Sequence, residues 1–195
     1  MKNFLYETQQ GSGSRTIFSV FVLLFFGVLI GIAIFNWKVS SKDYLADLIS
    51  DEVIKLTKVL ERIDGDCKIL SFDYQKNNIN FLNVVKFIGS EVGSINLAHP
   101  DKWQGPYLDD NPTYLGKEYL VVRTKKGYFV TPPEGVKLPN GLIIGKDIIL
   151  DEDADISAMM DDEKILRLND KPLAIPLNID ISGDASSLNL PMERI

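Results

Sequence analysis

Three aspartates at alternating positions are the residues of this chain whose types and spacing most suggest chemistry. Asp151, Asp153 and Asp155 stand in an acidic run that continues to Asp161 and Asp162. Calcium is a hard cation that takes about six to eight oxygen ligands, which carboxylates at this spacing can supply. A calcium-binding loop at Asp151, Asp153 and Asp155 is therefore one interpretation of the run.

The acidic run also departs from the EF-hand pattern for calcium. In a register that starts at Asp151, the sixth position holds Ile156 instead of the glycine that makes the sharp turn. The twelfth position holds Asp162, which is shorter than the usual glutamate. The alternative is a solvated acidic loop without metal, and both interpretations stay open. Calcium is the only cofactor that the sequence suggests.

Other catalytic and metal-binding arrangements lack the residues they need. His99 is the only histidine and Cys67 the only cysteine. A single cysteine excludes an intrachain disulfide and argues against a cysteine-based zinc site. The sequence contains neither a G-x-S-x-G nucleophile elbow nor a phosphate-binding glycine loop. An enzyme is the least supported class, and we expect a non-enzymatic function.

The element that must position the rest of the chain is an apolar stretch from Ile17 to Trp37, which contains no charged residue. About 20 apolar residues cross a bilayer as a helix. Arg15 flanks one end, and Trp37 and Lys38 stand at the other, where interfacial anchors are preferred. The residues at the C-terminal end of the stretch, Ala33-Ile34-Phe35-Asn36-Trp37, are too bulky for a signal-peptide cleavage site. The sequence therefore predicts an uncleaved transmembrane helix.

Composition and net charge limit which partners the rest of the chain can have. Beyond the span, about 155 of the 195 residues remain, enough for one domain with its own core. The net charge of -6 argues against a nucleic-acid partner. A short tail, a span and a large domain, in this order, favour an exported C-terminal domain.

The sequence predicts four segments along the chain. Flexible composition in Gly11-Ser12-Gly13-Ser14 predicts a tail at the N-terminus. The segments are a flexible tail (1–16), the transmembrane helix (17–37), an extracytoplasmic α+β domain (38–182) and a loose C-terminal tail (183–195). Within the span, Gly27 and Gly31 form a G-x-x-x-G, which lets two membrane helices approach closely, although glycine is common in such helices anyway.

An amphipathic helix is predicted directly after the span. Its apolar residues recur at intervals of three and four, and they are Leu45, Leu48, Ile49, Val53, Leu56, Val59, Leu60 and Ile63. Ser40 and Ser41 could cap a separate helix, but direct continuation is also allowed. A single helix from about Ile17 to Ile63 would be roughly 70 Å long. Its apolar face must be buried against the domain that follows, and Gly65 is a plausible stop.

Strand and turn signals dominate the rest of the chain. A hairpin is predicted from Glu118–Thr124 and Tyr128–Thr131 around Lys125-Lys126-Gly127. Further strands are expected at Leu142–Leu150, Ile165–Leu168 and Leu173–Ile181, a turn at Gln75–Asn78, a short helix at Phe81–Ile88 and a loop at Gly89–Pro100. Strands that cluster after helices predict an α+β fold, with a small antiparallel sheet packed on the long helix.

A block of aromatic residues, glycine and proline carries a resemblance to a known family. Trp103-Gln104-Gly105-Pro106-Tyr107-Leu108 is followed by Pro112 and by Gly116-Lys117-Glu118-Tyr119. Together with the long N-terminal helix, this block resembles the type IV pilin superfamily, and within it the major pseudopilin of type II secretion. The likeness covers about residues 17 to 135 and rests on Trp103, Gly105, Pro106 and Tyr107. Glycine and proline would set the direction of the chain, while the aromatic rings bury the loop against the helix.

The resemblance implies a function and a compartment. It implies a pilin-like structural component of a type II secretion or type IV pilus-like system, which associates with itself or with other pilin-like subunits. It also implies a single-pass protein of the inner (cytoplasmic) membrane with a periplasmic C-terminal domain. Some pseudopilins bind calcium in a loop near the sheet, which adds to the interest of Asp151, Asp153 and Asp155.

One feature of the family is missing. Pilins are cut after a glycine, and the mature chain begins with an apolar run that has a glutamate near its start. Neither Gly11 nor Gly13 is followed by such a glutamate, and the span contains no acid. The alternative is therefore a non-polymerising single-pass membrane protein with an extracytoplasmic binding or accessory domain.

Overall fold

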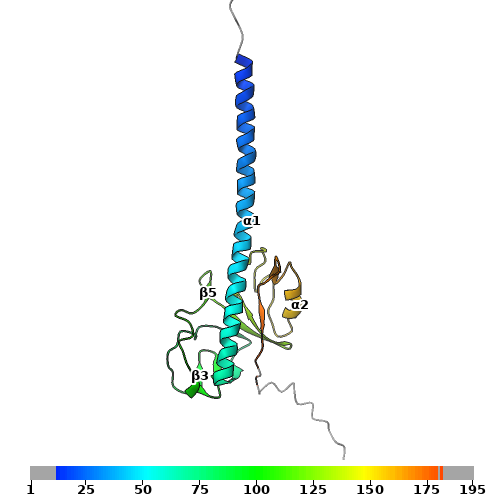
Figure 1. The fold of residues 1–195 in the computed structure, drawn as a ribbon. Coiled ribbons are helices and arrows are strands. Elements are labelled where there is room, and N and C mark those ends of the chain that lie inside the picture. Colours follow the sequence, from blue (N-terminus) through cyan, green and yellow to red (C-terminus); the bar gives the residue numbers. More distant parts are fainter. Residues whose placement is uncertain (1–11, 180, 182–195) are drawn as a thin grey trace, which may run out of the picture. The chain divides into compact units, whose positions relative to one another are not determined.

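The structure, a computed structural model, describes residues 12–179 and 181, with side chains from Phe18 onward. It forms two compact units, Met1–Ser41 and Lys42–Ile195. Helix α1 (Ser12–Cys67) contributes to both units. The other helices and strands of the described residues belong to the second unit (Figure 1). The predicted C-terminal tail at 183–195 lies outside the described residues.

In the first unit, α1 is an exposed apolar helix. From Phe18 to Ser41 every side chain is exposed except that of Val22, which is half-buried. The helix is long and apolar enough to cross a membrane, as judged by length and composition. The predicted flexible tail is wrong from Ser12 onward, because α1 already begins there. A helix that has formed over an apolar span extends at one hydrogen bond per added residue, so weak helix formers join it readily.

In the second unit, α1 buries one face. Ser40 and Ser41 lie inside the helix, so they cap no separate element. The buried positions recur every three or four residues, and they are Ala46, Ile49, Val53, Leu56, Leu60, Ile63 and Cys67. This confirms the predicted amphipathic helix, except that Leu48 is exposed. The helix continues past Gly65 and ends at Cys67.

The main sheet has four antiparallel strands in the order β11-β8-β7-β2. These strands are β2 (Lys76–Asn78), β7 (Leu120–Thr124), β8 (Gly127–Thr131) and β11 (Ile175–Leu177). Residues Leu120 and Thr131 pair at one end of the β7–β8 hairpin, and Thr124 and Gly127 at the other. Lys125 and Lys126 therefore form the turn, which confirms the predicted hairpin.

The helix and this sheet share one hydrophobic core. Ile49, Leu56 and Leu60 of α1 are fully buried in the same cluster as Val121 of β7 and Val130 of β8. Figure 1 shows the cyan part of α1 beside the strands of the second unit. Burial of a helix stripe against an antiparallel sheet gives the α+β class that the sequence predicts.

Three smaller sheets complete the second unit. One has three strands, and two are two-stranded. The three-stranded sheet contains β1 (Ile69–Phe72), β4 (Ile95–Leu97) and β3 (Glu91–Val92), in that order. One two-stranded sheet pairs β5 (Thr113–Tyr114) with β6 (Lys117–Glu118). The other pairs β9 (Arg167–Leu168) with β10 (Lys171–Pro172). A single-turn η1 (Pro100–Lys102) precedes the aromatic block.

Two segments predicted as irregular are strands. The predicted turn at Gln75–Asn78 is wrong, because most of it is β2, which pairs with β7. The predicted loop at Gly89–Pro100 contains β3 and β4, and β4 pairs with β1. Strands this short have weak local signals, so distant partners decide their conformation.

The helix predicted at Phe81–Ile88 is absent, and that prediction is wrong. The side-chain oxygen of Asn111 accepts hydrogen bonds from the amides of Leu82 (3.1 Å) and Asn83 (3.3 Å). The carbonyl of Leu82 accepts from the amides of Tyr107 and Leu108. Tertiary hydrogen bonds thus take the backbone groups that a helix would have used.

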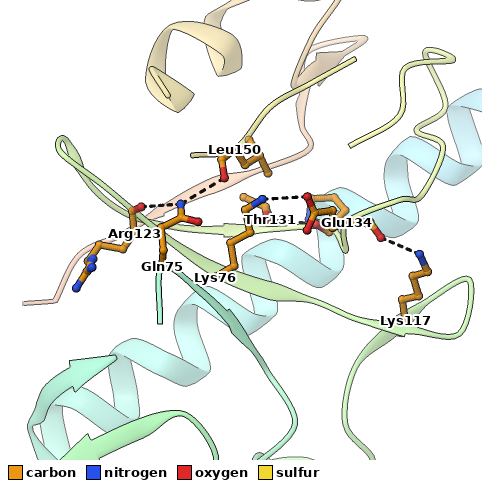
Figure 2. Close-up of polar contacts among 8 residues, drawn as sticks. Gln75, Lys76, Lys117, Arg123, Thr131, Glu134 and Leu150 are labelled. Carbon is orange, nitrogen blue, oxygen red and sulfur yellow. Dashed lines mark hydrogen bonds and ion pairs between the residues drawn. The ribbon is translucent and has the colours of Figure 1, made fainter. Parts of the chain in front are cut away.

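The C-terminal third also differs from its predicted elements. Residues 142–150 form isolated bridges, such as Lys137 with Ile143, instead of the predicted strand. The acidic run contains a short helix, α2 (Ile156–Asp161), which the sequence did not predict. The strands predicted at Ile165–Leu168 and Leu173–Ile181 are present only as the shorter β9 and β11, and β10 lies between the two predicted ranges. The segment after β8 is tied to the sheet by Gln75, whose amide donates to the carbonyls of Arg123 and Leu150 (Figure 2).

Candidate functional site

The aromatic block that carries the family resemblance folds as a packed loop. Trp103 and Tyr107 are half-buried and meet edge to face, with ring centroids 4.9 Å apart. Phe87 meets Trp103 in the same geometry at 5.3 Å. Edge-to-face pairs are favoured by the ring quadrupoles, and they stabilise a loop that has no ladder of backbone hydrogen bonds. The structure therefore brings the rings of Trp103 and Tyr107 together within the loop.

Gly105 allows the tightest contact of this loop. The indole Nε1 of Trp103 donates to the backbone oxygen of Val84 at 3.0 Å. A Cβ added at Gly105 would lie 2.2 Å from that oxygen and 2.3 Å from Nε1. The peptide bond between Gly105 and Pro106 is cis. Only glycine leaves room for this hydrogen bond.

Tyr107 joins the block to the last turns of α1. The guanidinium of Arg62 lies over its ring, 5.7 Å from the centroid, and the hydroxyl accepts from the amide of Gln104 at 3.3 Å. Cys67, the last residue of α1, is fully buried. Desolvation raises the pKa of Cys67 and also that of Tyr107. The block thus covers the end of the helix, which is the packing role expected from its sequence.

The three candidate calcium ligands are not brought together. Asp153 forms an ion pair with Lys125, and Asp155 forms one with Lys126. Asp155 also caps α2, because its carboxylate accepts from the amide of Ala158 at 3.2 Å. Among the described residues, no group of three or more histidine, cysteine, aspartate or glutamate side chains is placed to hold a metal ion.

The physical reason is local charge compensation. The two lysines of the β7–β8 turn neutralise Asp153 and Asp155, so these carboxylates need no cation to relieve their repulsion. The pKa of Asp155 is lowered, first by its hydrogen bond with Lys126 and then by the Ala158 amide. The acidic run contains the short helix α2, and calcium binding by Asp151, Asp153 and Asp155 stays an untested prediction.

Gly27 and Gly31 lie on the exposed part of α1. A Cβ added at either glycine would meet no atom within 4 Å of it. A shallow groove runs over this side of the helix, lined by Val20, Leu24 and Gly27 among others. The arrangement leaves space for a second helix, and the predicted helix–helix contact stays a prediction.

A hollow of about 600 Å³ in the second unit was not anticipated. It lies between β2, the β5–β6 hairpin and the segment that follows β8, and six of its lining residues are polar or charged. These six residues are Lys76, Asn78, Thr113, Lys117, Glu118 and Glu134. Figure 2 shows two lysines that reach Glu134 from opposite sides. Lys76 Nζ lies 2.9 Å from its carboxylate, and Lys117 Nζ donates to its backbone oxygen at 2.9 Å.

The sequence offered little sign of this hollow. Its residues come from three separate segments between positions 76 and 134, and Lys76 stands in a stretch predicted to be a turn. The one local signal is Pro132-Pro133-Glu134-Gly135, a turn composition directly after a strand.

Comparisons with known proteins add no assignment. No protein-family model, curated protein or solved structure matches the chain.

Proposed function

We propose that the chain is a membrane-anchored, pilin-like structural subunit that works by packing against other subunits rather than by catalysis. The observation that carries the proposal is α1. It is one helix whose first part is exposed and apolar and whose last part is buried in an antiparallel α+β domain. The resemblance of the Trp103–Leu108 block to the pilin superfamily supports the same function, since this block covers the end of α1.

The proposed setting follows from the span and the resemblance. The protein would sit in the inner membrane with its second unit in the periplasm. Its partners would be copies of itself or other pilin-like subunits of a type II secretion or type IV pilus-like system. Because Gly27 and Gly31 leave their side of α1 open, we expect the closest helix–helix contact there.

Cysteine cross-linking in native membranes tests this contact. In a Cys67→Ala background, Gly27→Cys should form a disulfide-linked dimer on mild oxidation. Leu29→Cys is the matched control, because it lies two residues away and about 200° around the helix. Dimers from Leu29→Cys but not from Gly27→Cys would contradict the proposed face. The absence of dimers from both variants would contradict association through the span.

A second candidate function is an anchored binding domain that never polymerises. Two observations favour it: the span lacks the acidic residue expected of an assembling pilin, and the second unit contains the polar hollow at Lys117. Mass spectrometry of the protein purified from its membrane separates the two candidates. Loss of the first 11 or 13 residues would indicate pilin-type processing after Gly11 or Gly13. An intact N-terminus would favour the anchored binding domain.

A further inference from the structure

The hollow at Lys117 is lined by two lysines and two glutamates. One lysine and one glutamate pair with each other, and the other two have no ion-pair partner among the residues that the structure describes. Lys76 and Glu134 form an ion pair at 2.9 Å and compensate each other. Within the part of the chain that the structure describes, neither Lys117 nor Glu118 has an ion-pair partner within 4.0 Å. The lining therefore offers one uncommitted ammonium and one uncommitted carboxylate.

The ammonium of Lys117 is held at the edge of the hollow by the main chain. Its Nζ donates to the backbone oxygen of Glu134, which uses one of its three N–H donors. A Cβ added at Gly135 would lie 2.7 Å from this nitrogen, so the glycine leaves room for it. Gly135 also has a positive φ of 74°, which disfavours other residues there. The other two N–H donors of Lys117 remain for a ligand.

The remaining polar groups of the hollow are neutral. Asn78 has an amide that can donate and accept, and Thr113 has a hydroxyl that can do both. A volume of about 600 Å³ lies within the range of small-molecule sites, roughly 300–1,000 Å³. The lining has two lysines and two glutamates, so its net charge is zero and it offers a phosphate no excess of positive charge.

We propose that this hollow binds a small zwitterion of the amino-acid or dipeptide class. The ligand's carboxylate pairs with Lys117 and its ammonium with Glu118, while Asn78 and Thr113 add neutral hydrogen bonds. Charge-assisted hydrogen bonds of both signs make such a ligand complementary to the lining. The proposal does not depend on polymerisation, so it can hold whether the chain is a pilin-like subunit or an anchored binding domain.

The test uses the full-length protein in detergent and three related compounds. L-alanyl-L-alanine carries both charges, its N-acetylated form keeps only the carboxylate, and its C-terminal amide keeps only the ammonium. Binding is measured by isothermal titration calorimetry at millimolar ligand concentrations. We expect the zwitterion to bind at least about tenfold more tightly than either blocked form, which corresponds to the loss of about one charge-assisted hydrogen bond.

Two variants and a control locate the site. Lys117→Gln should weaken binding of the dipeptide about tenfold or more, and so should Glu118→Gln. Lys58→Gln is the control, because Lys58 is an exposed lysine on α1 that does not line the hollow, and it should leave binding unchanged. Circular dichroism checks that each variant is folded.

Three outcomes would overturn the proposal. The first is no binding of the zwitterion by the wild-type protein. The second is equal binding of the N-acetylated form, which would remove the role of Glu118. The third is equal binding by Lys117→Gln and wild type, which would place the ligand elsewhere. None of these outcomes bears on N-terminal processing or on cross-linking through Gly27.

Discussion

The indole nitrogen of Trp103 reaches the backbone oxygen of Val84, 19 positions earlier in the chain, at 3.0 Å. This hydrogen bond passes directly beside Gly105, where no side chain fits. It joins the aromatic block to the segment that the sequence predicts as a helix. The same contact therefore explains why the glycine is needed and why the helix does not form.

Gly105→Ala should destabilise the second unit by about 1–3 kcal/mol, because the new methyl group would break the bond between Trp103 and Val84 or move the loop. The measurement is urea unfolding of the full-length protein in detergent, followed by near-ultraviolet circular dichroism. Gly65→Ala is the matched control, since its Cβ would meet nothing within 4 Å inside α1. That control should be neutral or stabilising by up to about 1 kcal/mol. Equal losses from both variants would contradict the steric argument.

Cys67 should react slowly with thiol reagents in the native protein. Its side chain is fully buried, and desolvation raises its pKa, so both access and thiolate content are low. As the only cysteine, it gives a single labelling phase with Ellman's reagent at pH 8. We expect rapid labelling only after denaturant unfolds the second unit. Labelling of the native protein at the rate of a free thiol would show that the end of α1 opens.

The protein should lose stability as pH rises above about 9. Burial raises the pKa of Cys67 from 9.0, and the pKa values of Tyr107, Tyr114 and Tyr119 from 10.0. The unfolded chain then releases these protons at lower pH than the folded one, so stability is full below the unfolded pKa values and falls as pH rises through the folded ones.

Thermal midpoints between pH 7 and pH 11 measure this alkaline loss. Tyr119 is almost fully buried, so Tyr119→Phe should flatten the dependence above pH 10. Tyr74→Phe, at an exposed tyrosine, is the control and should leave the slope unchanged. A slope that is identical in Tyr119→Phe and wild type would mean that this hydroxyl does not contribute.

Asp155 and Asp153 should differ in importance although each pairs with a lysine of the same turn. Only Asp155 also caps α2, so Asp155→Ala removes a cap as well as an ion pair, whereas Asp153→Ala removes only an exposed ion pair. We expect Asp155→Ala to lower the thermal midpoint more than Asp153→Ala. Added salt should reduce the effect of Asp153→Ala more than that of Asp155→Ala, since screening acts on the ion pair but little on the cap. Equal effects of both variants at all salt concentrations would contradict the capping role.

The sequence by itself determined the elements whose signals are long or local. The span is defined by a run of uncharged residues, and the buried face of α1 by a repeat of three and four that continues over several turns. The sequence predicts the β7–β8 hairpin because two segments rich in strand-forming residues flank the turn Lys125-Lys126-Gly127. In each case many neighbouring residues point to the same conformation, so no distant contact is needed to decide it.

Tertiary structure decided the short elements and the hollow. Asn111 and Trp103 form hydrogen bonds with backbone groups of the segment after Asn80, so the helix that the local sequence favours does not form. Lys125 and Lys126 form ion pairs with Asp153 and Asp155, a pairing that the spacing of the aspartates does not reveal. The hollow at Lys117 exists only because β2, β6 and the turn at Glu134 meet across the sheet. Contacts between residues far apart in the chain set these features, and a local pattern carries no information about such contacts.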